Sequence, residues 1–150
     1  MRGGPISIMN CTFCRILRNE LPASRVVEGT RTAAFLDVHP VSTGHALIVL
    51  RRHVVSFTDL SPAEASELFT TGQLLATHIK KTLENCEGIT VSLADGVSAG
   101  QEVPHAHLHI IPRTSGDGFG WKFPPNYTPA AAPRADLDAV AARIRASLGS

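Results

Sequence analysis

The 150-residue sequence predicts an α+β domain with about five strands in a mainly antiparallel sheet, one long helix and a C-terminal helix. Short β-rich runs lie before and after a single long stretch of helical periodicity, so strands and helices do not alternate as they do in parallel α/β folds. The length is that of about one domain and suffices for a buried core without disulfide bonds. A small sheet with uncovered edges also favours a homodimer.

The first part of the chain is expected to hold one short helix and three strands. Residues 1–10 are expected to form a flexible N-terminal segment. One or two helical turns are expected between Cys11 and Pro22. The strand expected at 45–50 is continuously apolar, which is typical of a central strand buried on both faces. The expected strands lie at residues 26–28, 32–36 and 45–50.

The start of the long helix is predicted by Ser61, Pro62 and Glu64. Ser61 is the expected N-cap, Pro62 would occupy the first helical position, and Glu64 would complete a capping box. Apolar residues follow at helical spacing as far as about Glu84, and Gly88 indicates where the helix stops.

Two further strands and a C-terminal extension are expected after this helix. One strand is predicted at 89–93, and a histidine-rich strand leads to Arg113. The composition then shifts to glycine and proline, so the domain is expected at 11–113 and an extension at 114–150. Apolar residues at helical spacing near its end predict a short amphipathic helix.

Composition excludes several classes of partner. The net charge of +1 offers no basic surface for nucleic acid or for an anionic membrane. No apolar run approaches the roughly 20 residues of a membrane span. The N-terminus lacks the apolar core of a signal peptide, and three cysteines are too few for a disulfide framework. We therefore expect a cytoplasmic protein.

Three histidines, His105, His107 and His109, alternate with apolar residues. On a strand they would form one row of imidazoles backed by an apolar face, whereas on a helix they would share no surface. The row could be a solvent-exposed polar face. Adjacent imidazoles repel when all are charged, however, so a role with an anion or a metal is the favoured interpretation.

Cys11 and Cys14 are spaced as two thiolates that share one zinc ion, which needs two more ligands from elsewhere. His53 and one of the three alternating histidines are the natural candidates. Two alternatives stay open: buried thiols that pack as small apolar groups, and a redox-active dithiol. A redox pair usually follows a strand, and no strand is expected before Cys11.

Together these motifs resemble the histidine-triad (HIT) family of nucleotide hydrolases and transferases. The run from His105 to Ile111 resembles its signature, in which three histidines alternate with apolar residues. The segment from Cys11 to Ile16 resembles the N-terminal box of the family. The segment 32–53 resembles the ribose-binding strand and loop of the family. The segment 100–105 is similar to the stretch that precedes the triad in its bacterial-type members. The resemblance implies a HIT-like fold over 11–113.

The resemblance also implies roles for individual residues. His107 would be the nucleophile that attacks the α-phosphorus of a nucleotide, and His109 would contact the phosphate oxygens. Gln101 would lie near the scissile bond, Gly100 would contact the nucleotide, and Asp37 would bind the ribose hydroxyls. The apolar clamp around a purine base would consist of Phe13, Ile16, Phe35 and Val38.

Zinc-binding members imply a second set of roles. In them the metal is held by a Cys-x-x-Cys pair, a histidine after the third strand and the first histidine of the triad. The corresponding ligands here are Cys11, Cys14, His53 and His105, and His105 could instead orient the phosphate site. Four protein ligands close a zinc site, so the ion would be structural.

Two positions depart from the family pattern. Ala94 and Asp95 stand where many members have an asparagine near the catalytic site, and Asp95 could substitute for it. Glu102 stands where some members have a hydroxyl that binds the leaving group. A carboxylate there would disfavour an anionic leaving group and tolerate an amine.

The expected protein is a cytoplasmic, homodimeric HIT hydrolase that releases a purine nucleoside monophosphate, AMP or GMP, from a phosphoramidate or similar conjugate. The alternative within the family is a dinucleoside polyphosphate hydrolase or phosphorylase. A nucleotide-binding module with little turnover and a thiol redox protein are alternatives of other classes.

Overall fold

The computed structural model describes residues 8–149. Most of the expected flexible segment at 1–10 lies outside the described residues. The chain divides into two compact units, one up to Gly118 and one from Phe119 onward. Each unit is described by itself.

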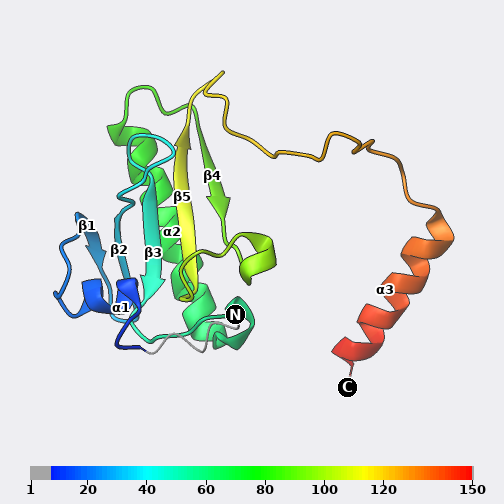
Figure 1. Ribbon diagram of the computed structural model, residues 1–150, viewed down its shortest axis with the longest axis horizontal. Helices are drawn as coiled ribbons and strands as arrows, with labels where there is room; N and C mark the ends of the chain where they lie inside the picture. The colour runs from blue at the N-terminus through cyan, green and yellow to red at the C-terminus, as the bar shows by residue number, and fades with distance from the viewer. Residues whose placement is uncertain (1–7, 150) are drawn as a thin grey trace. The chain divides into compact units, whose positions relative to one another are not determined.

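The first unit is built on a five-stranded sheet in the order β1-β2-β3-β5-β4, and every neighbouring pair is antiparallel (Figure 1). This arrangement confirms the predicted α+β class. Each predicted strand is present with bounds shifted by at most two residues. The strands are β1 (Arg25–Glu28), β2 (Thr32–Leu36), β3 (Ala46–Leu50), β4 (Gly88–Ser92) and β5 (His107–Arg113).

Two helices belong to this unit. The short helix α1 (Thr12–Leu17) lies within the stretch where helical turns were expected, and α2 (Pro62–Thr82) is the long helix. The predicted capping box is confirmed, because the Ser61 hydroxyl accepts from the Glu64 amide and the Glu64 carboxylate accepts from the Ser61 amide. The helix ends slightly before the predicted Glu84, since its C-cap, Leu83, is already extended.

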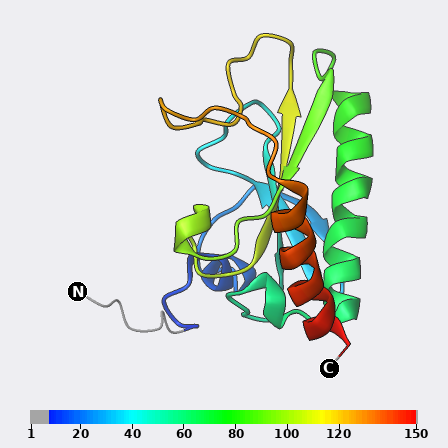
Figure 2. The ribbon, with the colours of Figure 1, turned by 90° about the vertical axis from the view of Figure 1, so that its right-hand side faces the viewer.

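The two faces of the sheet pack against different elements (Figure 2). Helix α2 packs against one face of the sheet. Its Leu68 and Leu75 contact Ile48, Leu108 and Ile110 of the strands. The residues that alternate with these point to the other face, toward α1. Together with residues of α1 they form a second cluster. Its buried members are Cys11, Phe13, Cys14, Ile16, Ala33, Phe35, Leu47 and Val49. Both sides of β3 are therefore buried, which explains its continuous apolar sequence.

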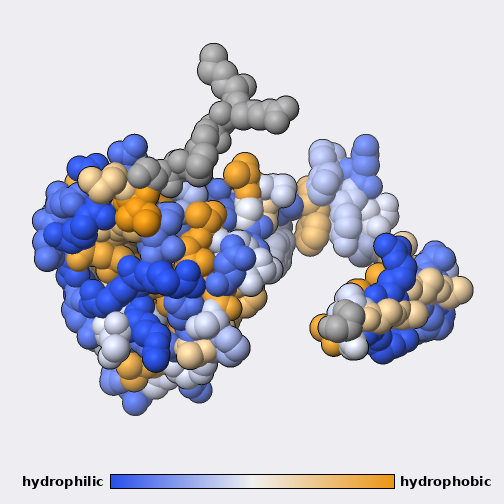
Figure 3. All heavy atoms as spheres, turned by 90° about the horizontal axis from the view of Figure 1, so that it is seen from below, coloured by the Kyte–Doolittle hydropathy of each residue, from blue (hydrophilic) through white to orange (hydrophobic). Residues whose placement is uncertain are grey.

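The second unit contains one helix, α3 (Arg134–Leu148), as its spacing of apolar residues predicted. Leu137, Val140, Ile144 and Leu148 are exposed, and Figure 3 shows apolar and hydrophilic residues side by side on this helix. Among residues 8–149, no helix is long and apolar enough to cross a membrane.

The expected histidine strand is shorter at its start than the sequence predicted. β5 begins at His107, so His105 lies before the strand. Pro104 has no amide hydrogen for a sheet ladder, and the His105 amide bonds back to the Val103 carbonyl at 2.8 Å. The chain bends there, and the fully buried His105 ring lies beside Cys11 and Cys14, while Phe13 contacts both His105 and His107.

Candidate active site and candidate metal centre

The bend before β5 divides the three histidines between two side-chain clusters. His105 is fully buried and faces α1. His107 and His109 stand on the strand, on the face opposite α2, with ring centroids 4.8 Å apart. We call the first group the cysteine cluster (Cys11, Cys14, His53 and His105) and the second the cavity cluster (Asp37, His45, His107 and His109).

The four ligand atoms of the cysteine cluster all lie within 4.8 Å of one another. His105 Nδ1 lies 3.5 Å from Cys11 Sγ and 3.6 Å from Cys14 Sγ. His53 Nδ1 lies 3.3 Å from Cys14 Sγ. A tetrahedral zinc ion, with its usual bond lengths, separates sulfur and nitrogen ligands by about 3.6 Å. The donor types and their spacing therefore fit one zinc ion.

Hydrogen bonding prepares His105 for this role. Its Nε2 lies 2.9 Å from the Leu50 carbonyl oxygen, which can only accept, so Nε2 carries the proton. Nδ1 then has a free lone pair toward the two sulfur atoms. Burial lowers the pKa of His105 to about 4, which keeps the ring neutral. Burial and the neighbouring Cys11 raise the pKa of Cys14 to about 11, so this thiol needs a nearby cation to ionise near pH 7.

A cavity of about 460 Å³ opens beside the cavity cluster. It gathers residues from α1, β2, the loop after β2, the segment before β5, and β5 itself. Its lining includes most of the residues expected to contact a nucleotide. These are Phe13, Ile16, Phe35, Asp37, Val38, Gly100, Glu102, His107 and His109.

His107 presents a free ring nitrogen to this cavity. Its Nδ1 lies 2.6 Å from the His105 carbonyl oxygen and must donate to it, so Nε2 keeps its lone pair. A backbone carbonyl thus fixes the tautomer. Burial lowers the pKa of His107, against the opposing charges of Asp37 and Glu102, so the neutral form prevails near pH 7. Phe13 packs its ring edge-on to His107 at a centroid distance of 5.1 Å.

A chain of hydrogen bonds sets the tautomer of His109. The Val41 amide donates to His45 Nδ1 at 3.1 Å, so His45 carries its proton on Nε2. His45 Nε2 then donates to His109 Nδ1 at 2.9 Å. In its neutral form His109 therefore holds its proton on Nε2, as a donor. Burial, with the charges of His107 and His45, lowers the pKa of His109 to about 4.

His45 is the member of this chain that sequence reasoning missed. It is buried, and its Nδ1 lies 3.7 Å from the Asp37 carboxylate. Strand pairing could have revealed it, because Leu47 of β3 pairs with His109 of β5. A side chain two residues before Leu47 points to the same face and lies diagonal to His109.

The HIT domain family matches residues 18–116 of the chain. The chain belongs to the HIT family. A HIT-like protein of Borreliella burgdorferi, itself uncharacterized, is 35% identical over 114 residues, which cover 75% of this chain and 82% of the relative.

Two further relatives bear on the clusters of this HIT domain. A crystal structure of a zinc-bound histidine triad family protein from Mycobacterium smegmatis superposes with a TM-score of 0.72 and 32% identity, covering 80% of this chain and 86% of that one. A bifunctional bis(5'-adenosyl)-triphosphatase/adenylylsulfatase of Arabidopsis thaliana is 40% identical over 84 residues, 56% of this chain and 46% of the relative.

Two expected nucleotide-site residues of the HIT domain use their polar atoms elsewhere. The Gln101 amide donates to the Val55 carbonyl at 2.9 Å and accepts from the Gly96 amide at 2.8 Å. The Asp95 carboxylate accepts from the Phe57 amide and the Ser56 hydroxyl. Neither residue lines the cavity. Their expected contacts with a nucleotide remain predictions.

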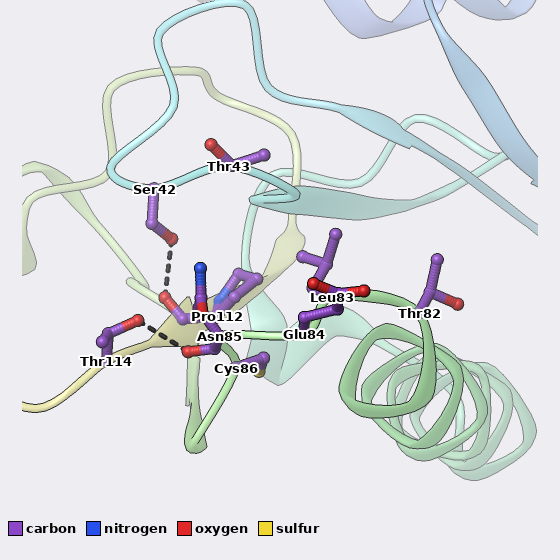
Figure 4. A pocket seen from close by; sticks show the side chains of 9 residues that line it. All are labelled: Ser42, Thr43, Thr82, Leu83, Glu84, Asn85, Cys86, Pro112 and Thr114. Atoms are coloured by element: carbon purple, nitrogen blue, oxygen red, sulfur yellow. Dashed lines mark hydrogen bonds between the residues drawn. The ribbon is translucent and has the colours of Figure 1, made fainter.

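A second cavity of the HIT domain, of about 530 Å³, lies between the loop after β2 and the ends of α2 and β5 (Figure 4). The Ser42 hydroxyl donates to the Pro112 carbonyl at 2.6 Å, and the Thr114 hydroxyl donates to the Asn85 carbonyl at 2.8 Å. Among the described residues that line it, none is a histidine. The side-chain hydroxyls here tie loops together, so we assign this cavity no reaction.

Proposed function

We propose that this HIT domain is a nucleotidyl hydrolase that releases a purine nucleoside monophosphate from a phosphoramidate or a similar conjugate. The observation that carries the proposal is the free Nε2 of His107, which faces a cavity large enough for a nucleotide. A module that only binds nucleotides has no need of such a nucleophile. The family is one of nucleotide-binding proteins and hydrolases, which supports the reaction class.

The first step forms a covalent intermediate. The lone pair on His107 Nε2 attacks the α-phosphorus while the bond to the leaving group breaks. The electron pair of that bond stays on the leaving atom, which takes up a proton from solvent. The imidazole becomes positively charged, and its Nδ1 hydrogen bond to the His105 carbonyl stabilises that charge.

The second step regenerates the enzyme. Water attacks the phosphorus, the bond to Nε2 breaks, and the ring recovers its lone pair as one proton passes to solvent. In both steps, His109 donates its Nε2 hydrogen to a phosphate oxygen. The donor is aimed by the hydrogen-bond chain that starts at the Val41 amide, so no rearrangement is needed when charge develops.

The remaining cavity residues would hold the nucleoside. Phe13, Ile16 and Phe35 are buried and apolar, which suits one face of a purine base, and Val38 is exposed at the edge. Asp37 offers carboxylate oxygens to ribose hydroxyls. Gly100 has a positive φ of 92°, a conformation that suits glycine and brings its backbone to the cavity wall.

The cysteine cluster is proposed to hold a structural zinc ion. Cys11, Cys14, His53 and His105 would fill all four positions, so the ion would join α1 to the ends of β3 and the segment before β5. When bound it supplies cross-linking and charge compensation for two thiolates. The zinc-bound relative from Mycobacterium smegmatis supports this assignment. Three free cysteines agree with a reducing, cytoplasmic environment.

A homodimer is the proposed assembly. β4 is an edge strand of the sheet, and Val91 on it is 49% exposed. Phe69 on α2 is 46% exposed. Unpaired strand edges and exposed apolar residues favour association with a second copy.

A dinucleoside polyphosphate is the second candidate substrate. The name of the Arabidopsis thaliana relative, a bis(5'-adenosyl)-triphosphatase, favours it. Both candidates share the attack by His107 and differ in the leaving group.

The decisive experiment is mass spectrometry of the protein after brief mixing with adenosine 5'-phosphoramidate. The wild type is expected to gain the mass of one adenylyl group transiently and to release AMP. His107→Ala removes the nucleophile and should give neither the adduct nor AMP above background, a loss of at least about 10⁴-fold. His78→Ala, which removes an exposed imidazole on α2, is the matched control and should behave as the wild type.

Nucleotide binding without an adduct or AMP in the wild type would overturn the hydrolase in favour of a binding module. An adduct that persists in His107→Ala would reassign the nucleophile. Cleavage of diadenosine triphosphate but not of the phosphoramidate would select the second candidate.

A further inference from the structure

The charged side chains that line the candidate active site are all acidic, apart from its imidazoles. Asp37 and Glu102 both line the cavity, and among its described lining residues none is lysine or arginine. A bound phosphate would therefore meet neutral donors and two nearby carboxylates. This balance penalises a substrate that carries several negative charges.

The two carboxylates differ in how they are engaged. One Asp37 oxygen accepts from the His39 amide at 2.9 Å, and the other lies 3.7 Å from His45 Nδ1. Glu102 is exposed and forms no hydrogen bond or ion pair with another residue in the described part of the chain. It lines the same cavity as His107. Glu102 is thus a carboxylate beside the nucleophile that is available to a ligand.

The burial of the cavity residues indicates which part of a substrate meets Glu102. Phe13 and Phe35 are only 5% and 3% exposed and form the apolar floor, whereas Glu102 is exposed at the mouth. A base held on the floor leaves the group on the far side of the phosphorus at the mouth. The leaving group is therefore the part nearest to the free carboxylate.

We infer that Glu102 selects leaving amines that carry an additional positive charge. This inference rests on the proposed function and names its substrate class, a nucleoside phosphoramidate whose amine bears an ammonium or guanidinium group. His107 Nε2 bonds to phosphorus as the P–N bond breaks, and the electron pair goes to the amine nitrogen, which takes one proton from solvent. A polyphosphate leaving group would instead place several negative charges beside Glu102.

The test compares three AMP phosphoramidates of propylamine whose far ends carry trimethylammonium, methoxy or sulfonate. The ratios of kcat/KM between them are measured for the wild type, Glu102→Gln and the matched control Glu84→Gln. Glu84 lies at the second cavity, so its replacement removes a carboxylate away from the nucleophile. Comparing ratios between variants cancels the intrinsic reactivity of each amine.

The wild type should prefer the cationic over the neutral substrate, and the neutral over the anionic, by about tenfold at each step. Glu102→Gln should shrink both ratios by about that factor, while Glu84→Gln should keep them. Raising the ionic strength to about 0.5 M should shrink them in the wild type, because the carboxylate is exposed and screened by salt.

Two outcomes separate this inference from the proposed function. Release of AMP from all three substrates with equal efficiency, or a charge preference that survives in Glu102→Gln, would overturn the inference and leave the hydrolase intact. No release of AMP from any of the three by the wild type would overturn the proposed function and the inference together.

Discussion

The cysteine cluster and the cavity cluster share one segment of five residues, yet they are built for different tasks. His105 turns into the core, is closed off from solvent, and has both ring nitrogens engaged. His107 and His109 turn to a cavity, and each is left with one ring nitrogen that no described residue engages. Closed coordination is typical of a structural metal site, whereas a free nitrogen beside a cavity is typical of a reactive one.

The difference teaches that one sequence motif supplies side chains to two clusters. His105 follows a bend at Pro104 and reaches the cysteines beside α1, although Phe13 packs against both His105 and His107. Loss of the first histidine should act on stability, and loss of the second on chemistry. The two clusters are linked through the His105 carbonyl, which accepts the Nδ1 hydrogen of His107.

The largest expected effect on stability comes from breaking the cysteine cluster. Cys14→Ser removes one of four ligands from the cysteine cluster and leaves three donors without their cross-link. We expect bound zinc to be lost and the free energy of unfolding to fall by about 3–5 kcal/mol. Zinc content after denaturation and urea unfolding curves measure the two quantities.

Cys86→Ser is the matched control for this change. Cys86 lies outside both clusters, and its thiol donates to the Gly88 carbonyl, which a hydroxyl can also do. Zinc content and stability should therefore match the wild type. Equal stability of the two serine variants, together with a wild type free of zinc, would show that the cysteine cluster is not a structural zinc site.

Much of this arrangement could be predicted from sequence, because it rests on local patterns. Short β-rich runs predicted the strands, including the continuously apolar run of β3, and Ser61 with Glu64 predicted the start of α2. Cys11, Cys14 and the candidate His53 could be named from residue types and spacing, whereas His105 was singled out as the fourth ligand by the resemblance to zinc-binding HIT members.

The remainder depends on pairings between distant segments. The carboxylate of Asp95 is held by Ser56 and the Phe57 amide, and the Gln101 amide by Val55 and Gly96. No local pattern indicates that these polar atoms are already occupied. His45 was missed for the same reason, since its partner is 64 residues away.

The second expected effect probes the cavity cluster through pH. Burial lowers the pKa of His45, and lowers that of His109 to about 4, below the ordinary value of 6.5. Between pH 6.5 and about 4 the unfolded chain therefore binds more protons than the native one. Stability from these rings is fully present above pH 6.5 and is lost on acidification, by at most about 1.4 kcal/mol per pH unit for each ring.

Urea unfolding at pH 7, 6 and 5 measures this slope. His109→Gln removes one titrating group from the cavity cluster and should flatten the dependence. His78→Gln, which replaces an exposed imidazole, should keep it. Identical slopes for the wild type and His109→Gln would show that the third histidine of the triad does not stay neutral in the fold.

The smallest expected effect concerns the contact between α2 and the opposite face of β5. This contact lies away from both clusters, so changing it should alter stability alone. A Cβ added at Gly72 of α2 would lie 2.9 Å from Leu108 Cδ2 and 3.3 Å from Ile110 Cδ1. Both neighbours are fully buried, so overpacking should outweigh the roughly 1 kcal/mol that alanine contributes to a helix. We expect Gly72→Ala to lower the free energy of unfolding by about 1 kcal/mol in urea titrations. The control Gln73→Ala, on the exposed side of α2, should change it by less than about 0.5 kcal/mol.

A more stable Gly72→Ala variant would show that the contact between α2 and β5 can widen. Zinc content should not change, because Leu108 and Ile110 point away from His107 and His109 and the added methyl group reaches neither cluster.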